Sequence, residues 1–146
     1  MYPIAIAKVT AALGGPRVLG TAPRNLPELA AAVAHGLPRG VVREVAAHAA
    51  PMKGGLRNKV AALVVSPATY KRSQRLSPAA SERAERLARV AALAAQALGS
   101  EDEARMWLNT PHPLLGNQVP IEIAAGDLGA RQVERILINI EHGLPV

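Results

Sequence analysis

The chain has 146 residues, of which 49% are apolar, and it contains one Trp, two Tyr, no Phe and no Cys. The absence of Cys excludes a disulfide framework and thiolate metal sites. A core with so few aromatic side chains must consist mainly of Leu, Val, Ile and especially Ala. Because Ala is the best helix former and its small side chain lets helices approach closely, this composition favours an all-α fold. The net charge of +6 is uneven: residues 1–75 hold eleven Lys/Arg and two acids, whereas residues 76–146 hold six Arg and nine acids.

Residues 1–24 contain several turn-forming residues and predict an N-terminal arm with a short apolar strand or helix at its start. Gly14-Gly15 lacks the flanking strand and the Lys of a phosphate-binding loop, so we interpret it as a turn. No basic region precedes a long apolar stretch, so we expect no signal peptide. Charges or Pro interrupt every apolar run before the roughly 20 residues that a membrane span needs.

The predicted helical domain covers residues 25–98 and begins with a helix capped by Asn25 and continuing to about Ala34. A second apolar segment follows at residues 41–49 and ends before Pro51. The apolar face of the first helix is expected to consist of Leu26, Leu29, Ala30 and Val33.

Two short helices joined by a tight turn are predicted at about 56–64 and 66–74, the second with Ser66 as N-cap. This pair is typical of a helix-turn-helix, whose second helix presents hydrogen-bonding side chains to base edges. An ordinary helical hairpin with a solvated basic edge is the alternative. The candidates for contact with bases are Ser66, Thr69, Tyr70 and Arg72 or Gln74, and those for contact with phosphates are Lys53, Arg57, Lys59, Lys71 and Arg75.

A longer linking helix is predicted from Ser77-Pro78 to Leu98, with Gly99 as its stop signal. Its apolar stripe is expected to pack within the chain, although a dimer contact would use the same stripe. The stripe consists of Leu87, Val90, Ala91, Ala94 and Leu98.

Residues 99–146 form the last predicted domain. A helix at 101–108 starts after Ser100 and carries the only Trp, Trp107, which we expect to anchor the local core. An irregular Pro/Gly-rich segment and a short apolar run lead to an amphipathic helix at 128–142. We expect Asp127 to cap that helix and Gly143 to end it, with Val133, Ile136, Leu137 and Ile140 on its buried face.

Three motifs in this last domain carry a family resemblance. They are Ala104-x-x-Trp107-Leu108-x-x-Pro111, Leu115-Gly116-x-x-x-Pro120-Ile121-Glu122, and Gly129-x-x-x-Val133-x-x-x-Leu137-x-x-Ile140-x-x-Gly143. In this order and at these separations they resemble the toxin-binding domain of the Xre/MbcA/ParS antitoxins. That family places a helix-turn-helix region before this domain, in agreement with the predicted pair of short helices.

The resemblance implies a cytoplasmic antitoxin of a type II toxin-antitoxin system. Its partner would be a RES-domain toxin that depletes NAD, neutralised by occlusion of the active-site entrance, and the antitoxin would repress its own operon as a homodimer bound to operator DNA. The last helix and the tail would dock on the toxin through Arg131, Arg135, Asn139, His142, Gly143, Leu144, Pro145 and Val146.

The sequence offers no recognisable catalytic motif. The four His residues are far apart in the sequence, and none is paired at HxxxH spacing. Ser66, Ser77 and Ser81 have settings typical of helix caps, so we do not interpret them as nucleophiles. We therefore expect no enzymatic activity, cofactor or metal. The alternatives are a stand-alone dimeric DNA-binding regulator, whose last domain only dimerises or senses a small ligand, and an adaptor for another enzyme. The basic first half suits a polyanion and the acidic second half a protein partner, whereas an ordinary solvated surface would need neither.

Overall fold

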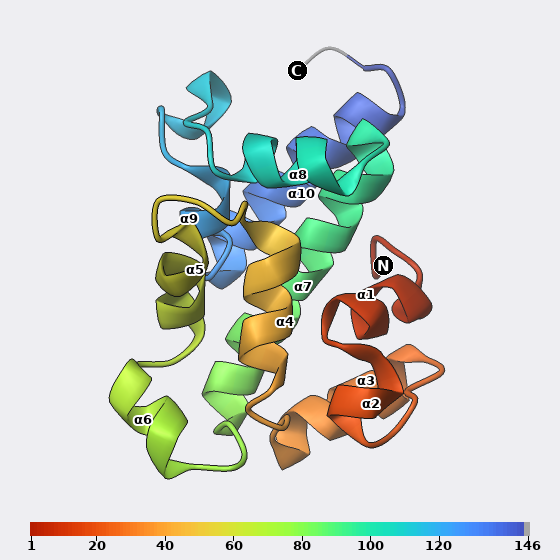
Figure 1. Cartoon of the computed structure of the whole chain (residues 1–146). Helices are drawn as coiled ribbons and strands as arrows, with labels where there is room; N and C mark the ends of the chain where they lie inside the picture. The colour runs from red at the N-terminus through yellow and green to blue at the C-terminus, as the bar shows by residue number, and fades with distance from the viewer. Residues whose placement is uncertain (145–146) are drawn as a thin grey trace.

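The computed structural model describes residues 1–144, and over these residues the fold is all-α, as predicted, with ten α-helices, one 3-10 helix and no strand (Figure 1). The elements are α1 (Ile6–Ala12), α2 (Gly15–Leu19), α3 (Leu26–His35), α4 (Val41–Ala49), α5 (Leu56–Val64), α6 (Pro67–Arg72), α7 (Pro78–Leu98), α8 (Glu101–Leu108), the 3-10 helix η1 (Pro113–Leu115), α9 (Pro120–Ile123) and α10 (Asp127–Glu141).

Side-chain caps fix where four of these helices begin. Ser66, Ser77 and Ser100 each accept a hydrogen bond from the backbone N–H three residues later, and Asn25 does the same for α3. These bonds satisfy one of the amides that a helix start leaves without an intrahelical partner. The predicted starts at these positions are confirmed.

The central element is α7, which runs through the middle of the molecule and contacts α1, α3, α4, α5, α8 and α10 (Figure 1). Its inward side is made of Leu and small Ala side chains, which let several helix backbones approach one axis. Most of the predicted stripe is buried, with Leu98 only partly so. Ala84, Ala88 and Leu93 are also buried, so α7 contributes more than one face to the core.

The segment expected to be an N-terminal arm folds as α1 and α2 and joins the core. Val9 and Leu13 are fully buried, and α1 packs against α7. The turn between the two helices was expected, and it depends on Gly14, whose φ of 105° is unfavourable for other residues. A Cβ at Gly14 would lie 2.6 Å from Val18 and 2.8 Å from Glu44, so the close approach of α2 to α4 also needs a glycine here.

Three local predictions were wrong. Leu26 and Ala30 were assigned to the buried face of α3 but both are exposed, Leu26 at 45%, because the side of the helix that packs on α7 is the one that carries Leu29 and Val33. Asp127 is the first residue of α10, and Gly126 occupies the N-cap position. The helix expected to reach residue 74 ends at Arg72. No helix within residues 1–144 has the length and apolar character needed to cross a bilayer.

Candidate DNA-binding and partner-binding surfaces

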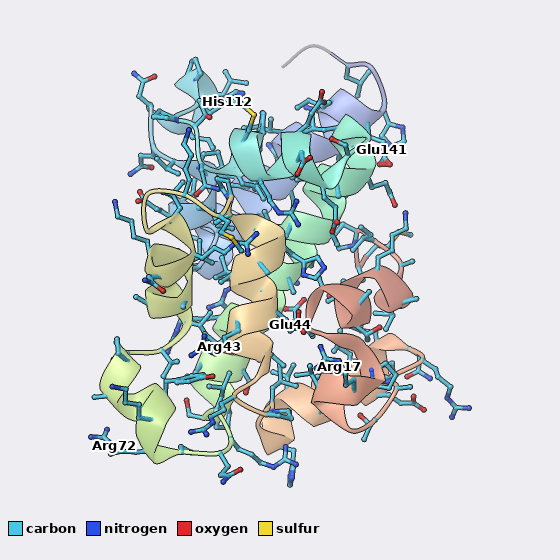
Figure 2. All side chains as sticks on the ribbon, in the orientation of Figure 1. Arg17, Arg43, Glu44, Arg72, His112 and Glu141 are labelled. Carbon is cyan, nitrogen blue, oxygen red and sulfur yellow. The ribbon has the colours of Figure 1, made fainter. Side chains whose placement is uncertain are left out.

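The two predicted surfaces lie at different ends of the molecule. Helix α6 occupies an outer corner, and α10 ends on the far side, beyond α8 (Figure 1). In Figure 2, Arg72 of α6 is at the lower left, whereas His112 and Glu141 lie near the top. A macromolecule bound at α6 therefore leaves the end of α10 open to a second partner.

Val65 and Ser66 form the short turn between α5 and α6. The hydroxyl of Ser66 accepts a hydrogen bond from the Thr69 N–H at 3.2 Å, and its oxygen lies 3.0 Å from Thr69 Oγ1. Arg72 donates to the same Thr69 oxygen at 3.2 Å. No residue of α6 is fully buried, so this helix exposes most of its surface to solvent, as a DNA recognition helix must.

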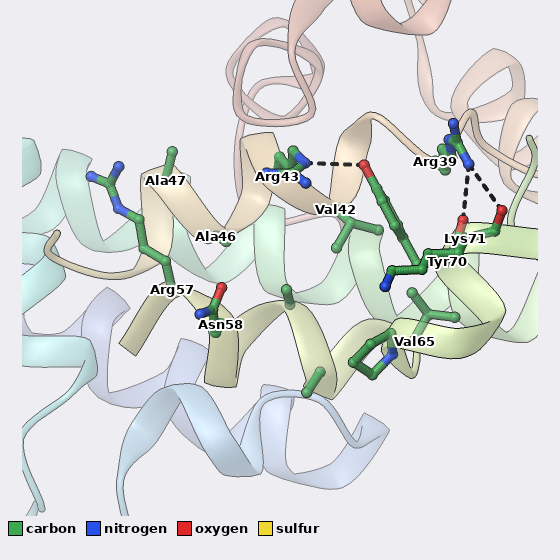
Figure 3. A pocket seen from close by; sticks show the side chains of 13 residues that line it. Arg39, Val42, Arg43, Ala46, Ala47, Arg57, Asn58, Val65, Tyr70 and Lys71 are labelled. Carbon is green, nitrogen blue, oxygen red and sulfur yellow. Dashed lines mark hydrogen bonds between the residues drawn. The ribbon is translucent and has the colours of Figure 1, made fainter. Parts of the chain in front are cut away.

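Tyr70 attaches α6 to α4. Its hydroxyl accepts a hydrogen bond from Arg43 Nε at 3.1 Å, and its ring lies 5.3 Å from the Arg39 guanidinium and 5.6 Å from that of Arg43 (Figure 3). Arg39 also donates to the backbone carbonyl of Tyr70 at 3.1 Å. Cation–π contacts of this kind contribute about 0.5–1 kcal/mol each at exposed sites. The structure thus gives Tyr70 an intramolecular contact that the sequence pattern did not reveal.

The cations predicted to contact phosphates differ in their surroundings. Arg57 donates to the Ala50 carbonyl at 3.0 Å, and Arg75 donates to the Gly36 carbonyl at 2.8 Å. Both carbonyls belong to residues that directly follow a helix, where backbone acceptors lack intrahelical partners. The remaining cations of this set extend into solvent, namely Lys53, Lys59 and Lys71.

The predicted toxin-binding residues of α10 line one outer stripe of the helix. Arg131, Arg135 and Asn139 follow each other at four-residue spacing, the two arginines are exposed, and Asn139 is partly exposed. Arg131 pairs with Asp127 at 3.5 Å. The sequence interpretation missed Leu128, which is 74% exposed at the start of this stripe. The opposite face, including Val133 and Leu137, is buried.

The end of α10 forms a Schellman motif, as its glycine predicts. The Leu144 N–H donates to the Asn139 carbonyl at 2.8 Å and the Gly143 N–H donates to the Ile140 carbonyl at 3.1 Å, while Gly143 has a φ of 69°. This geometry turns the chain off the helix axis directly after exposed His142. Pro145 and Val146, which were also predicted to bind the toxin, lie outside the described residues.

Exposed apolar side chains are concentrated in the last domain. Met106 is 67% exposed, Leu114 57% and Leu144 53%. Trp107 packs against the core but is only partly buried, and its ring centroid lies 5.5 Å from that of His112. Such side chains favour a protein partner, and their exposure has no periodic signal in the sequence.

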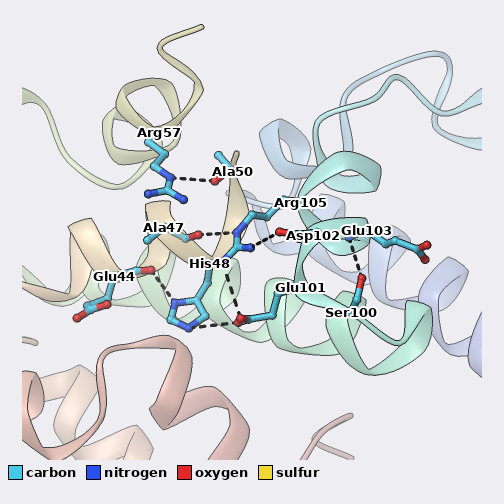
Figure 4. A network of polar contacts seen from close by, with 10 residues as sticks. All are labelled: Glu44, Ala47, His48, Ala50, Arg57, Ser100, Glu101, Asp102, Glu103 and Arg105. Atoms are coloured by element: carbon cyan, nitrogen blue, oxygen red, sulfur yellow. Dashed lines mark hydrogen bonds and ion pairs between the residues drawn. The ribbon is translucent and has the colours of Figure 1, made fainter. Parts of the chain in front are cut away.

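The carboxyl end of α4 joins the two halves of the chain (Figure 4). Arg105 of α8 donates to the Ala47 carbonyl, and Asn109, which directly follows α8, donates to the Ala49 carbonyl, each at 2.8 Å. His48 lies 3.6 Å from the Glu101 carboxylate. These bonds occupy carbonyls that a helix end leaves without intrahelical partners, and they fix α8 on α4.

A partly buried charge cluster connects the N-terminal segment with α7 and α10. Arg89 pairs with Glu85 and Glu134, and Tyr2 donates a hydrogen bond to Glu85. Burial raises the pKa of Glu134, against the opposing effect of Arg89, and the Glu85 carboxylate raises it further. Burial, followed by the charge of Glu85, raises the pKa of Tyr2, so the phenol remains a donor at neutral pH.

Comparison with known families gives two matches, which divide the chain between residues 89 and 93. Residues 28–89 match the family described as the antitoxin Xre-like helix-turn-helix domain, and residues 93–143 match the family described as the antitoxin Xre/MbcA/ParS C-terminal toxin-binding domain. A search of curated proteins finds no match to this chain. The first match contains the α5–α6 pair and the second contains α8 and the whole of α10. The chain therefore belongs to the Xre-type antitoxins.

Proposed function

We propose that this antitoxin acts in the cytoplasm by binding a RES-domain toxin, which depletes NAD, and covering the entrance to its active site. The outer stripe of α10 with the following tail supports this proposal best, because it presents exposed charges and apolar groups on a rigid helix. The guanidinium groups of Arg131 and Arg135 suit carboxylates or carbonyls of the toxin. The mechanism is binding, and no residue of the antitoxin takes part in a reaction.

A truncated chain that ends at Ile140 tests this mechanism. The truncation removes exposed His142, Gly143 and Leu144, together with the Schellman motif, while the buried residues of α10 remain. We expect the truncated chain to lose protection of cells that express the cognate toxin, and to lose co-purification with that toxin. Full protection by a folded truncated chain would overturn the proposal.

A charge reversal at Arg135 tests the stripe without shortening the chain. Arg135→Glu is expected to weaken toxin binding by about tenfold or more, since each tenfold change corresponds to about 1.4 kcal/mol. Arg24→Glu makes the same charge change just before α3, outside both candidate surfaces, and serves as the control. Equal effects of the two substitutions would indicate that only net charge matters.

We propose in addition that the antitoxin, as a homodimer, represses its own operon. The open position of α6 supports this proposal, with Ser66, Thr69 and Arg72 near base edges and Lys53, Lys59 and Lys71 near phosphates. Tyr70, Arg57 and Arg75 already make intramolecular hydrogen bonds, so any contact of theirs with DNA would be made in addition to these bonds.

The salt dependence of operator binding tests the DNA proposal. Each phosphate contact contributes a slope of about 0.9 in log affinity against log salt. Lys59→Ala or Lys71→Ala should therefore lower the slope by about one contact each, and Arg24→Ala should leave it unchanged. Binding that is insensitive to salt would contradict the proposed phosphate contacts.

A further inference from the structure

A groove of about 830 Å³ lies between α4 and α5 and is bounded at one end by the start of α6 (Figure 3). Its walls are mainly small apolar side chains, so the groove stays open where larger residues would fill it. Arg57 and Asn58 line one end, and Tyr70 and Lys71 line the other. The apolar lining is made of Val42, Ala46, Ala47, Ala61, Ala62, Val65 and Pro67.

Every charged residue that lines this groove is a cation. The four are Arg39, Arg43, Arg57 and Lys71, and no carboxylate is among the lining residues. Arg43 and Arg57 each use Nε for an intramolecular hydrogen bond, to Tyr70 and to the Ala50 carbonyl. These bonds orient both guanidinium groups, and within residues 1–144 their terminal nitrogens make no further hydrogen bond or ion pair. The cations are therefore positioned without being neutralised.

Two other kinds of occupant fit this groove less well. A second copy placed by two-fold symmetry would bring the same four cations together, which is unfavourable. A nucleic-acid backbone would pair with the cations, but the apolar lining offers it little, because Asn58 and Tyr70 are the only uncharged polar side chains there. An amphipathic protein segment with carboxylates beside its apolar residues matches both the lining and the charge.

We propose that the α4–α5 groove binds an acidic amphipathic helical segment of a protein partner. The small apolar residues of the bound segment lie against Ala46, Ala62 and Val65 of the groove, and the carboxylates of the segment pair with Arg43, Arg57 and Lys71. Nine residues of α4 extend over about 13 Å at 1.5 Å per residue, so two to three helical turns of the segment span the groove. This surface is separate from the α10 stripe and does not depend on the identity of the toxin.

The experiment measures binding of a short fluorescein-labelled helical peptide, with Ala and Leu on one face and Glu on both flanks, by anisotropy with the full chain. The matched probe replaces every Glu by Lys. We expect the Glu peptide to bind with an affinity that falls as salt rises, and the Lys peptide not to bind. In two-dimensional NMR spectra the Glu peptide should shift the amide signals of Ala46, Ala62 and Val65, and leave those of Leu128 and Leu144 in place.

Two variants assign the binding to the groove. Lys71→Glu reverses an exposed charge on its rim, and Ala62→Trp fills the groove from an exposed position of α5. Each should weaken binding of the Glu peptide by about tenfold or more, whereas Arg24→Glu should change it little. The proposal is overturned if both probes bind equally, or if neither variant weakens the Glu peptide. It is also overturned if Ala62→Trp abolishes binding of duplex DNA while the Glu peptide fails to bind, because the groove then belongs to nucleic acid.

Discussion

The two family-matched regions differ in the side chains that they expose to solvent. In the helix-turn-helix region, Arg39, Arg57 and Arg75 donate to backbone carbonyls at or after helix ends, so part of the basic charge stabilises the fold. In the toxin-binding region, three of the seven large exposed hydrophobic side chains of the described chain lie on α8, η1 and α10, and a fourth, Leu144, directly follows the matched residues. Net charge therefore overstates how much of the basic charge of the first region is free to contact another molecule, and the exposed apolar residues of the second region favour contact with a protein.

The largest expected effect concerns whether these regions unfold separately. Leu29→Ala in α3 and Leu137→Ala in α10 each remove a fully buried side chain, which costs about 2–5 kcal/mol. Because both helices pack on α7, we expect one shared transition in urea. Circular dichroism and Trp107 fluorescence should give the same midpoint in both variants. A Leu29→Ala variant whose Trp107 midpoint matches that of the unmodified protein would show that the halves are independent.

A smaller effect is expected at the contact between the regions. Arg105→Met removes the donor to the Ala47 carbonyl and should lower the free energy of unfolding by about 1–3 kcal/mol. Arg131→Met is the matched control, because its side chain is 72% exposed, against 19% for Arg105, and should change stability by less than about 0.5 kcal/mol. If urea denaturation shows equal losses of unfolding free energy in the two variants, the contact between the halves adds nothing to stability.

A third prediction concerns the attachment of α6. Tyr70→Ala removes the hydrogen bond from Arg43 and the cation–π contacts, and should weaken the local structure by about 1 kcal/mol. Hydrogen exchange should accelerate in α6 and remain unchanged in α10. Unchanged exchange in α6 would show that the turn at Ser66 holds this helix without Tyr70.

The smallest effect depends on pH. The pKa of Glu134 is raised above its ordinary value of 4.5, mainly by burial. A carboxyl with a raised pKa in the folded state contributes stability that is complete below the unfolded value and is lost as the pH rises through the folded value. The stability of the unmodified protein relative to Glu134→Gln should therefore decrease as the pH rises above about 4.5. Urea denaturation between pH 4 and 8 measures this difference, and Glu122→Gln, at an exposed position of α9, is the control. A difference that grows with pH would contradict the prediction.

Local signals in the sequence determined much of the fold. Ser66, Ser77 and Ser100 marked helix starts correctly because an N-cap is set by bonds within a few residues. The packing of α1 on α7 was not predictable in this way, because it joins segments that are distant in the sequence. The exposure of Leu26 and Ala30 was missed for a related reason, since apolar periodicity in α3 does not show which part of the apolar stripe its packing partner covers.

The candidate surfaces were predicted less completely than the fold. The four-residue spacing placed Arg131, Arg135 and Asn139 on one stripe, which the helical geometry of α10 reproduces. The contacts of Arg57 with Ala50 and of Arg43 with Tyr70 depend on tertiary packing, so composition could not separate structural cations from exposed ones.

The boundary between the two family matches, at residues 89–93, falls inside the continuous helix α7. A single residue inserted there would rotate everything after it by about 100° and move it by about 1.5 Å. The bonds from Arg105 and Asn109 to α4 would then lose their acceptors. Chimeras that exchange toxin specificity between relatives must therefore preserve the helical phase across α7, whereas changes in length are better tolerated in the exposed turn at 52–55.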